Sequence, residues 1–326
     1  MGAGVGATRE DVVECYRHFL RREPESEEAV ARHLAGEPTL WDLVRRFEAA
    51  PEARQAAVKA PSADMLAGYD PRGNRPAASR SDAVSLLEHV KSVWSRYGER
   101  DAYYSVLTES KYLAENLGDG DIDAFYATGQ YDADLMLKSF ERNDIAIDTA
   151  WEILDFGCGV GRIGEHLSRR FSKYAGVDIS AGHLAIASRR FREHDVANAS
   201  LVTLSNYLAH PFDIDILFSV IAFQHNPPPV MEMLLDVLLG RVRPGGYAYF
   251  QMPCHLYNYE FSVEDYLAGR GRLEVMEMHA LPQDRVFALL ARHGLRPIEV
   301  LPDPRIGDAG YSFTFFAEKA RAAAGA

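Results

Sequence analysis

The sequence predicts an α/β protein with a mostly parallel sheet and a small helical unit ahead of it. After Ala150, short apolar runs alternate with segments of helical periodicity, which is typical of strands joined by crossover helices. A glycine-rich turn directly follows the first of these runs, as it does at the ligand-binding edge of such sheets. Before residue 61 the apolar residues recur at helical spacing instead.

Residues 1–60 are expected to form a helical appendage. Val12, Tyr16 and Phe19 recur at helical spacing, and Thr39 with Asp42 is spaced as a variant of the capping box. A unit of about fifty residues has a marginal core of its own. We therefore expect it to dock, either on the main domain or on a second copy of the chain in a homodimer.

Two further segments precede the sheet. Residues 61–82 hold three prolines and two glycines and have the composition of a linker. Residues 83–150 return to helical periodicity and are rich in aromatic side chains, so we predict a helical lid or cap over the site. The alternative is that these rings form the core of a helical layer.

The sheet region begins at residue 151 and is expected to run to residue 320. The predicted strands are 151–156, 174–178, 201–204, 214–223, 247–252, 297–301 and 311–317, and the clearest helices between them are 162–171, 181–193 and 283–293. A Pro/Gly turn alone separates the last two strands, so we expect them to form an antiparallel edge.

Composition excludes several classes of partner. The 326 residues include 35 Lys and Arg against 47 Asp and Glu, and the net charge of −12 argues against a nucleic-acid partner. Three scattered cysteines are too few for a disulfide framework or a zinc site, so we expect no metal and a cytoplasmic location. The first residues lack the apolar core of a signal peptide, and the most apolar stretch is shorter than the roughly 20 residues of a membrane helix. We expect no membrane association.

The first chemical motif is the run Ile153-Leu-Asp-Phe-Gly-Cys-Gly-Val-Gly-Arg162. Glycines at a strand-to-helix turn let backbone amides approach a ligand closely. A dinucleotide site would place its third glycine at position 162, where this chain has arginine. The pattern therefore favours a ligand without a pyrophosphate, although a plain tight turn remains the structural alternative.

The second motif is Tyr174-Ala-Gly-Val-Asp-Ile-Ser180, a strand that ends in Asp178. Its spacing of about twenty residues from the glycine turn is that of a carboxylate that binds ribose hydroxyls. The alternative is that Asp178 caps the helix that begins near Ser180.

Together these motifs resemble those of class I S-adenosylmethionine-dependent methyltransferases. The runs DIDILFSVIAFQHNPP and RVRPGGYAYF look like that family's fourth strand and loop and its fifth strand, and the resemblance spans most of residues 90–318. It implies a seven-stranded, Rossmann-like sheet with helices on both faces, the last strand antiparallel, and S-adenosyl-L-methionine across the carboxyl ends of the strands. The residues that it assigns to the cofactor are Asp155, Gly157, Cys158, Gly159 and Gly161 for the methionine end, and Asp178 and Ile179 for the ribose. The chain departs from the family after the third strand, where an acid often binds adenine and this chain has Ser205-Asn206-Tyr207, so we expect Asn206 to take that role.

Three more residues are candidates for the acceptor side. His225 follows the fourth strand, where a base could face the transferred methyl group, or it could simply order the loop before Pro227. His279 precedes a helix and is the second candidate base, with an ordinary surface histidine or a helix-start residue as the alternative. Tyr126, beside a glycine in the aromatic segment, is expected to point toward the cofactor.

The sequence thus predicts an enzyme that transfers a methyl group from S-adenosyl-L-methionine to a small-molecule acceptor, with oxygen favoured as the methylated atom. The competing hypothesis is a cofactor-binding scaffold without turnover, whose role the appendage supplies. The sequence identifies neither the acceptor nor the oligomeric state.

Overall fold

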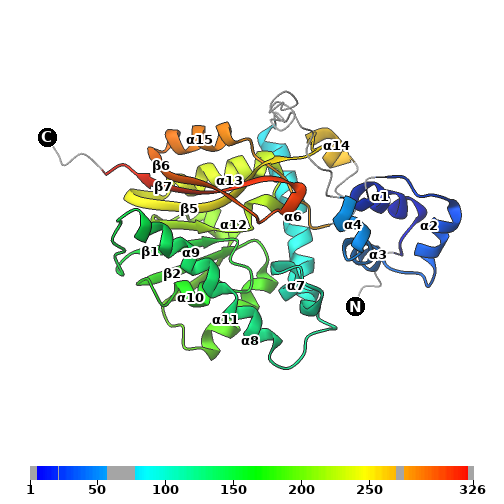
Figure 1. Cartoon of the computed structure of the whole chain (residues 1–326), viewed down its shortest axis with the longest axis horizontal. Coiled ribbons are helices and arrows are strands. Elements are labelled where there is room, and N and C mark those ends of the chain that lie inside the picture. Colours follow the sequence, from blue (N-terminus) through cyan, green and yellow to red (C-terminus); the bar gives the residue numbers. More distant parts are fainter. Residues whose placement is uncertain (1–5, 21, 57–77, 269–274, 322–326) are drawn as a thin grey trace.

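The structure is a computed structural model that describes residues 6–20, 22–56, 78–268 and 275–321. Its centre is a seven-stranded sheet in the order β3-β2-β1-β4-β5-β7-β6 (Figure 1). The strands are β1 Glu152–Phe156, β2 Lys173–Asp178, β3 Ala199–Thr203, β4 Ile214–Ser219, β5 Val242–Leu256, β6 Leu295–Asp303 and β7 Gly310–Lys319. Strands β1 to β5 pair in parallel and β7 runs antiparallel to both of its neighbours, which confirms the predicted fold class.

Helices cover both faces of the sheet because successive strand residues point to opposite sides. One face packs against α9 (Gly129–Arg142), α10 (Gly164–Leu167) and α11 (Ala181–Glu193). The other face packs against α12 (Leu204–Ala209), α13 (Pro228–Gly240) and α15 (Gln283–Arg292). In β1, Ile153 belongs to the first of these cores and Leu154 to the second.

Three elements differ from their predicted bounds by more than two residues, and one of them is β5, which runs over Val242–Leu256 instead of 247–252. The predicted strand 214–223 stops at Ser219, because the chain turns at Ile221 and a 3₁₀ turn, η3 (Phe223–His225), follows. The helix predicted over 162–171 is regular only over Gly164–Leu167.

The segment ahead of the sheet also differs from its prediction. The predicted linker, 61–82, overlaps the first turn of α6 (Arg80–Arg100), because Ser79 and Asp82 form a capping box that starts this helix. Residues 61–77 of the predicted linker lie outside the described residues. Residues 83–150 do not form one lid. Helix α9 is part of the layer on the sheet, and within this range the pocket residues come from α6 and α7 (Ala102–Val106). The remaining elements here are η2 (Ser110–Tyr112) and α8 (Asp121–Ala127).

The N-terminal helical unit consists of α1 (Arg9–Leu20), α2 (Glu27–Leu34), α3 (Leu40–Glu48) and α4 (Pro51–Ala56) and lies beside α6 (Figure 1). Its core contains residues from α1, α2 and α3 and also Val275, which precedes α15. Trp41 packs against Val93 and Tyr97 of α6. The unit therefore docks on the sheet-bearing domain of its own chain; whether it also binds a second copy stays a prediction.

A carboxylate at this docking surface gives a testable prediction. Tyr97 donates a hydrogen bond to Glu48 at 3.0 Å, and burial raises the pKa of the Glu48 carboxyl to about 7. Since the unfolded chain loses this proton near its ordinary pKa of 4.5, the folded state loses stability as the pH rises from 4.5 through about 7. We expect Glu48→Gln to melt roughly 2–4 °C above the wild type at about pH 8 and level with it at about pH 4. Equal melting temperatures at both pH values would contradict this reading.

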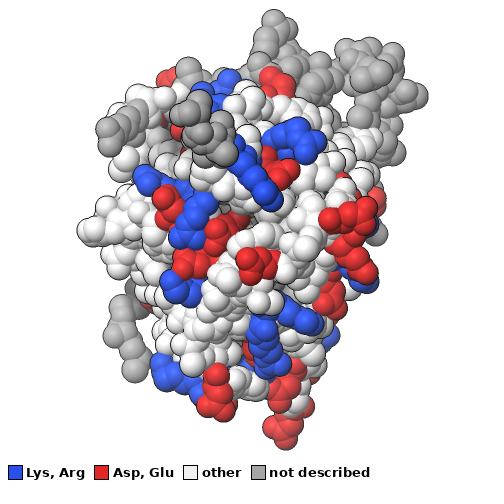
Figure 2. Space-filling model, turned by 90° about the vertical axis from the view of Figure 1, so that its left-hand side faces the viewer, with Lys and Arg blue, Asp and Glu red and all other residues white. Residues whose placement is uncertain are grey.

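The surface carries charges of both signs. On the face in Figure 2, Lys and Arg side chains are interspersed with Asp and Glu rather than gathered into one basic area. Among the described helices, none is long and apolar enough to cross a membrane.

Candidate functional site

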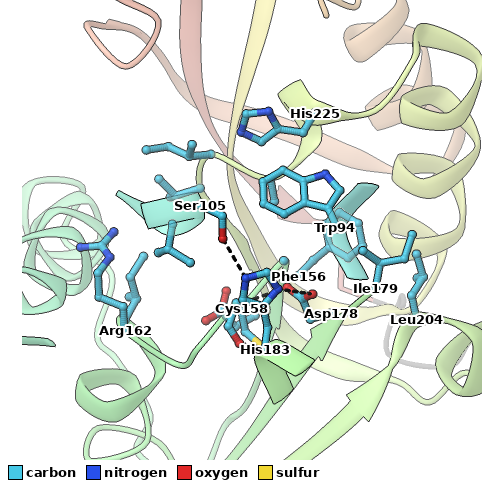
Figure 3. A pocket seen from close by; sticks show the side chains of 18 of the residues that line it. Trp94, Ser105, Phe156, Cys158, Arg162, Asp178, Ile179, His183, Leu204 and His225 are labelled. Carbon is cyan, nitrogen blue, oxygen red and sulfur yellow. Dashed lines mark hydrogen bonds and ion pairs between the residues drawn. The ribbon is translucent and has the colours of Figure 1, made fainter. Parts of the chain in front are cut away.

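A pocket opens at the carboxyl ends of β1, β2 and β4, with α6 and α7 across from the sheet (Figure 3). Its lining residues include Val90, Trp94, Ser105, Val106, Asp155, Phe156, Gly157, Cys158, Gly159, Arg162, Asp178, Ile179, His183, Leu204, Ile221, Ala222, His225 and Asn226. Most of the predicted cofactor residues thus meet in one place.

The glycine turn adopts a backbone that other residues rarely take. Gly157 has φ of 75° and Gly159 has φ of 54°, and a side chain at Gly157 would collide with the Cβ atom of Ala222. Gly161 differs from its prediction, because it does not line the pocket. It lies against Phe191 of α11 and allows the turn to pack on that helix.

Two carboxylates hold the turn. Asp178 accepts hydrogen bonds from the backbone N–H of Gly159 and from that of Ser180, both at 2.8 Å. Asp155 is buried and accepts a hydrogen bond from the Tyr174 hydroxyl at 2.8 Å. Burial raises the pKa of Asp155 to about 7. Asp178 therefore lines the pocket and also orders the backbone around it. The cap of α11 is Ser180 rather than Asp178, and the role of Asp178 toward ribose stays a prediction.

Cys158 and Ile179 also line the pocket, whereas two other predicted cofactor residues do not. Asn206 is exposed on α12, and the pocket residue nearby in sequence is Leu204. Tyr126 is buried outside the pocket, where its hydroxyl donates a hydrogen bond to the Val160 carbonyl at 2.9 Å. Phe125 and Tyr126 of α8 pack in one cluster with Val160 of the glycine turn, so Tyr126 supports the turn without lining the pocket.

His225 lies at the upper side of the pocket in Figure 3, with its ring 5.0 Å from that of Trp94. Its Nδ1 is 2.8 Å from the Glu277 carbonyl oxygen, which can only accept, so Nδ1 carries the proton and Nε2 keeps a lone pair. This lone pair faces the side-chain nitrogen of Gln224 at 3.4 Å. Burial lowers the pKa of His225 to about 4. The side chain is therefore a neutral imidazole at physiological pH.

His279 does not reach the pocket. It is buried, with Nδ1 2.7 Å from the Tyr259 hydroxyl and Nε2 3.2 Å from the Glu277 carboxylate. Its backbone N–H donates to the Gln224 carbonyl at 2.7 Å. The structure therefore supports neither prediction for His279. It is buried against the η3 loop, so it is not a surface residue, and it does not line the pocket in which a base would act.

Sequence reasoning missed several pocket residues. Arg162 is buried, donates to Asp132 at 2.6 Å, and its Nε has no hydrogen-bond partner among the described residues. Arg162 occupies the position at which a dinucleotide site has its third glycine, and this departure from the motif could have identified it as a pocket residue. His183 is also buried and lies 2.8 Å from the Ser105 hydroxyl. No local pattern distinguishes it from an ordinary helix residue.

The loop after β4 is held in a strained shape. Ile221 has φ of 56°, a conformation that β-branched residues rarely adopt. Its N–H donates to the side chain of Gln251 at 3.1 Å, and Gln251 in turn donates to Gln224 and to Ser312. These buried amides fix the backbone that carries His225.

Comparisons with known proteins agree with this geometry. Residues 153–246 match the sequence model of a family described as a methyltransferase domain. Ubiquinone biosynthesis O-methyltransferases from Thiobacillus denitrificans and Sodalis glossinidius are 29% and 32% identical over 101 and 100 residues, 30% of this chain in each case. The matched region spans 43% and 39% of those two proteins.

A solved structure extends the likeness in the fold. Magnesium protoporphyrin IX methyltransferase from Synechocystis, with bound SAH, superimposes with a TM-score of 0.50 at 15% identity, covering 71% of this chain and 100% of that chain. The strand order, the glycine turn and the acid at the end of β2 are those that the sequence motifs imply. The chain therefore has the class I, Rossmann-like fold of the S-adenosylmethionine-dependent methyltransferases, and its residues 153–246 match a methyltransferase domain.

Proposed function

We propose that this protein methylates a hydroxyl group of a small molecule and uses S-adenosyl-L-methionine as the methyl donor. The observation that carries the proposal is the neutral imidazole of His225, whose unprotonated nitrogen shares a pocket with the glycine turn and Asp178. The curated relatives that match a part of the chain are named as O-methyltransferases, which supports oxygen as the acceptor atom.

The pocket residues suit this cofactor from end to end. Ile179 and Leu204 form an apolar end in Figure 3, fit for the adenine ring. Asp178 follows, with lone pairs left for two ribose hydroxyls after its two backbone contacts. Arg162 lies at the far end, where its unpartnered Nε–H can donate to the carboxylate of the methionine part.

Bound S-adenosyl-L-methionine supplies a methyl group on a positively charged sulfur. The chain's own residues then have to align the acceptor and take up its proton. Trp94 and Ile221 present apolar surface on the acceptor side and exclude water there. His225 Nε2 has a long contact of 3.4 Å with the side-chain nitrogen of Gln224, and an acceptor hydroxyl that replaces this contact would give its proton to Nε2.

The low basicity of His225 narrows the acceptor class. A base with a pKa of about 4 removes a proton efficiently from an acidic hydroxyl and poorly from an aliphatic alcohol. We therefore propose a phenol or an enol, whose flat ring would also fit beside the Trp94 side chain.

A first experiment measures the formation of S-adenosylhomocysteine with a panel of phenols, enols and aliphatic alcohols. We expect turnover with an acidic hydroxyl, and we expect His225→Gln to reduce kcat by about 100-fold or more with little change in affinity for S-adenosylhomocysteine. Because protonation blocks the base, the wild-type rate should rise through about pH 4 and level off above it, whereas the variant should lack this step. Turnover that His225→Gln leaves intact would exclude the base.

The scaffold hypothesis makes the opposite prediction. Tight binding of S-adenosylhomocysteine without turnover on any panel member or in a cell extract would favour it. Absence of binding to the wild type would contradict both.

A further inference from the structure

We infer that the N-terminal helical unit α1–α4 is a positioning element of the site, acting on His225 and Trp94 through two adjoining contacts. The inference goes beyond the proposed reaction and rests on it only for the role of His225 as the base. Trp94 is next to Val93, which packs against the unit, and His225 is hydrogen-bonded to Glu277, two residues after Val275 in the core of the unit.

The first contact runs through the segment that begins at Val275. The Val275 side chain is 3% exposed and belongs to the core of the helical unit, although the residue is far from that unit in sequence. Two residues later, the carbonyl oxygen of Glu277 accepts the hydrogen bond from Nδ1 of His225 at 2.8 Å. The position of this carbonyl therefore depends on how the unit is seated.

The second contact runs through α6. Trp41 packs against Val93 and Tyr97, and Glu48 accepts the hydrogen bond of the Tyr97 hydroxyl. Trp94 lies between these two α6 residues in sequence and lines the pocket. The docking surface and the pocket wall are thus two sides of the same helical turn.

Met276 joins the two contacts. It packs against the cluster that Trp41 forms with α6, and its backbone also hydrogen bonds the Tyr97 phenol oxygen. Because Met276 lies between Val275 and Glu277, a shift of the helical unit would move the pocket sides together. Loss of the Glu277 contact would also remove the acceptor that fixes the proton on Nδ1 of His225.

The effect on His225 can be measured without an acceptor. In the full-length protein, Trp41→Ala removes the ring that packs with α6 and Met276, and it substitutes no residue that lines the pocket. The readout is the Cε1–H signal of His225 in NMR spectra of histidine-labelled protein, assigned with His225→Gln. The matched control is Val30→Ala, which removes methyl groups from a side chain as buried as Val275 in the same core, but on α2.

In Trp41→Ala we expect the His225 signal to shift and its protonation midpoint to rise from about 4 toward the ordinary 6.5, because water reaches the ring. His279 and the Glu277 carboxylate face the same segment, so the His279 signal is followed beside it. In Val30→Ala the His225 signal and midpoint should stay at their wild-type values. An unchanged His225 titration in folded Trp41→Ala would overturn the inference.

Two milder variants keep the test decisive if Trp41→Ala does not fold. Val275→Ala loosens the first contact and Tyr97→Phe removes the hydrogen bond to Glu48, and each should raise the midpoint by a smaller amount. Wild-type midpoints in both would also overturn the inference. Binding of S-adenosylhomocysteine to the wild type, measured in parallel, tests the proposed function separately, since the NMR titration requires no ligand.

Discussion

Asp178→Asn is expected to weaken the binding of S-adenosylhomocysteine by about 100-fold, because it removes the charge that would strengthen hydrogen bonds from two ribose hydroxyls. The measurement is calorimetric titration beside thermal unfolding. The wild-type carboxylate also accepts the N–H groups of Gly159 and Ser180, so the variant should lose some stability as well. If Asp178 binds the ribose, the affinity for S-adenosylhomocysteine must fall by more than the loss of a backbone contact alone would cause.

Asp215→Asn provides the matched control for that experiment. Asp215 is also a strand acid that accepts a backbone N–H, that of Glu152 at 2.8 Å, but it lies in β4 and does not line the pocket. Its substitution should lower the melting temperature without changing the affinity for S-adenosylhomocysteine. If both variants lost affinity equally, Asp178 would be a structural residue and the ribose assignment would fail.

Local patterns in the sequence predicted most of the fold. The helix over 181–193 has the predicted bounds because Ser180 caps its first turn, a signal carried by adjacent residues. The strands of the parallel sheet were predictable because each is a short apolar run between turns. Pocket residues that lie in these motifs, such as Gly157 and Asp178, were predictable for the same reason.

What the sequence could not predict depends on packing between distant segments. Asn206 and Tyr126 have suitable chemistry but lie on helix faces that turn away from the pocket, and a shift of one or two residues along a helix decides this. His225 lines the pocket and His279 does not, and this difference likewise depends on how the η3 loop packs against the segment before α15. No local pattern encodes that contact.

Arg162 shows how a departure from a motif can carry the chemistry of a site. Its guanidinium shares one carboxylate, Asp132, with Arg305, since each arginine donates to it at 2.6 Å. Asp155 also interacts electrostatically with Arg162, and the Nε–H of Arg162 has no partner among the described residues. An unpaired buried donor on a guanidinium favours an anion in the pocket. The carboxylate of the cofactor's methionine part fits this requirement.

Arg162→Met should therefore weaken the binding of S-adenosylhomocysteine by about 30-fold or more, since a carboxylate would lose a charge-assisted hydrogen bond. The variant should fold, because Asp132 keeps its bond to Arg305. Binding of 5′-methylthioadenosine, which lacks the amino-acid end, should change by less than about threefold. Arg305→Met is the control, because Arg305 shares Asp132 but does not line the pocket, and it should leave both affinities near those of the wild type. Equal losses for both ligands in Arg162→Met would mean that the guanidinium supports the fold of the pocket rather than binding the carboxylate.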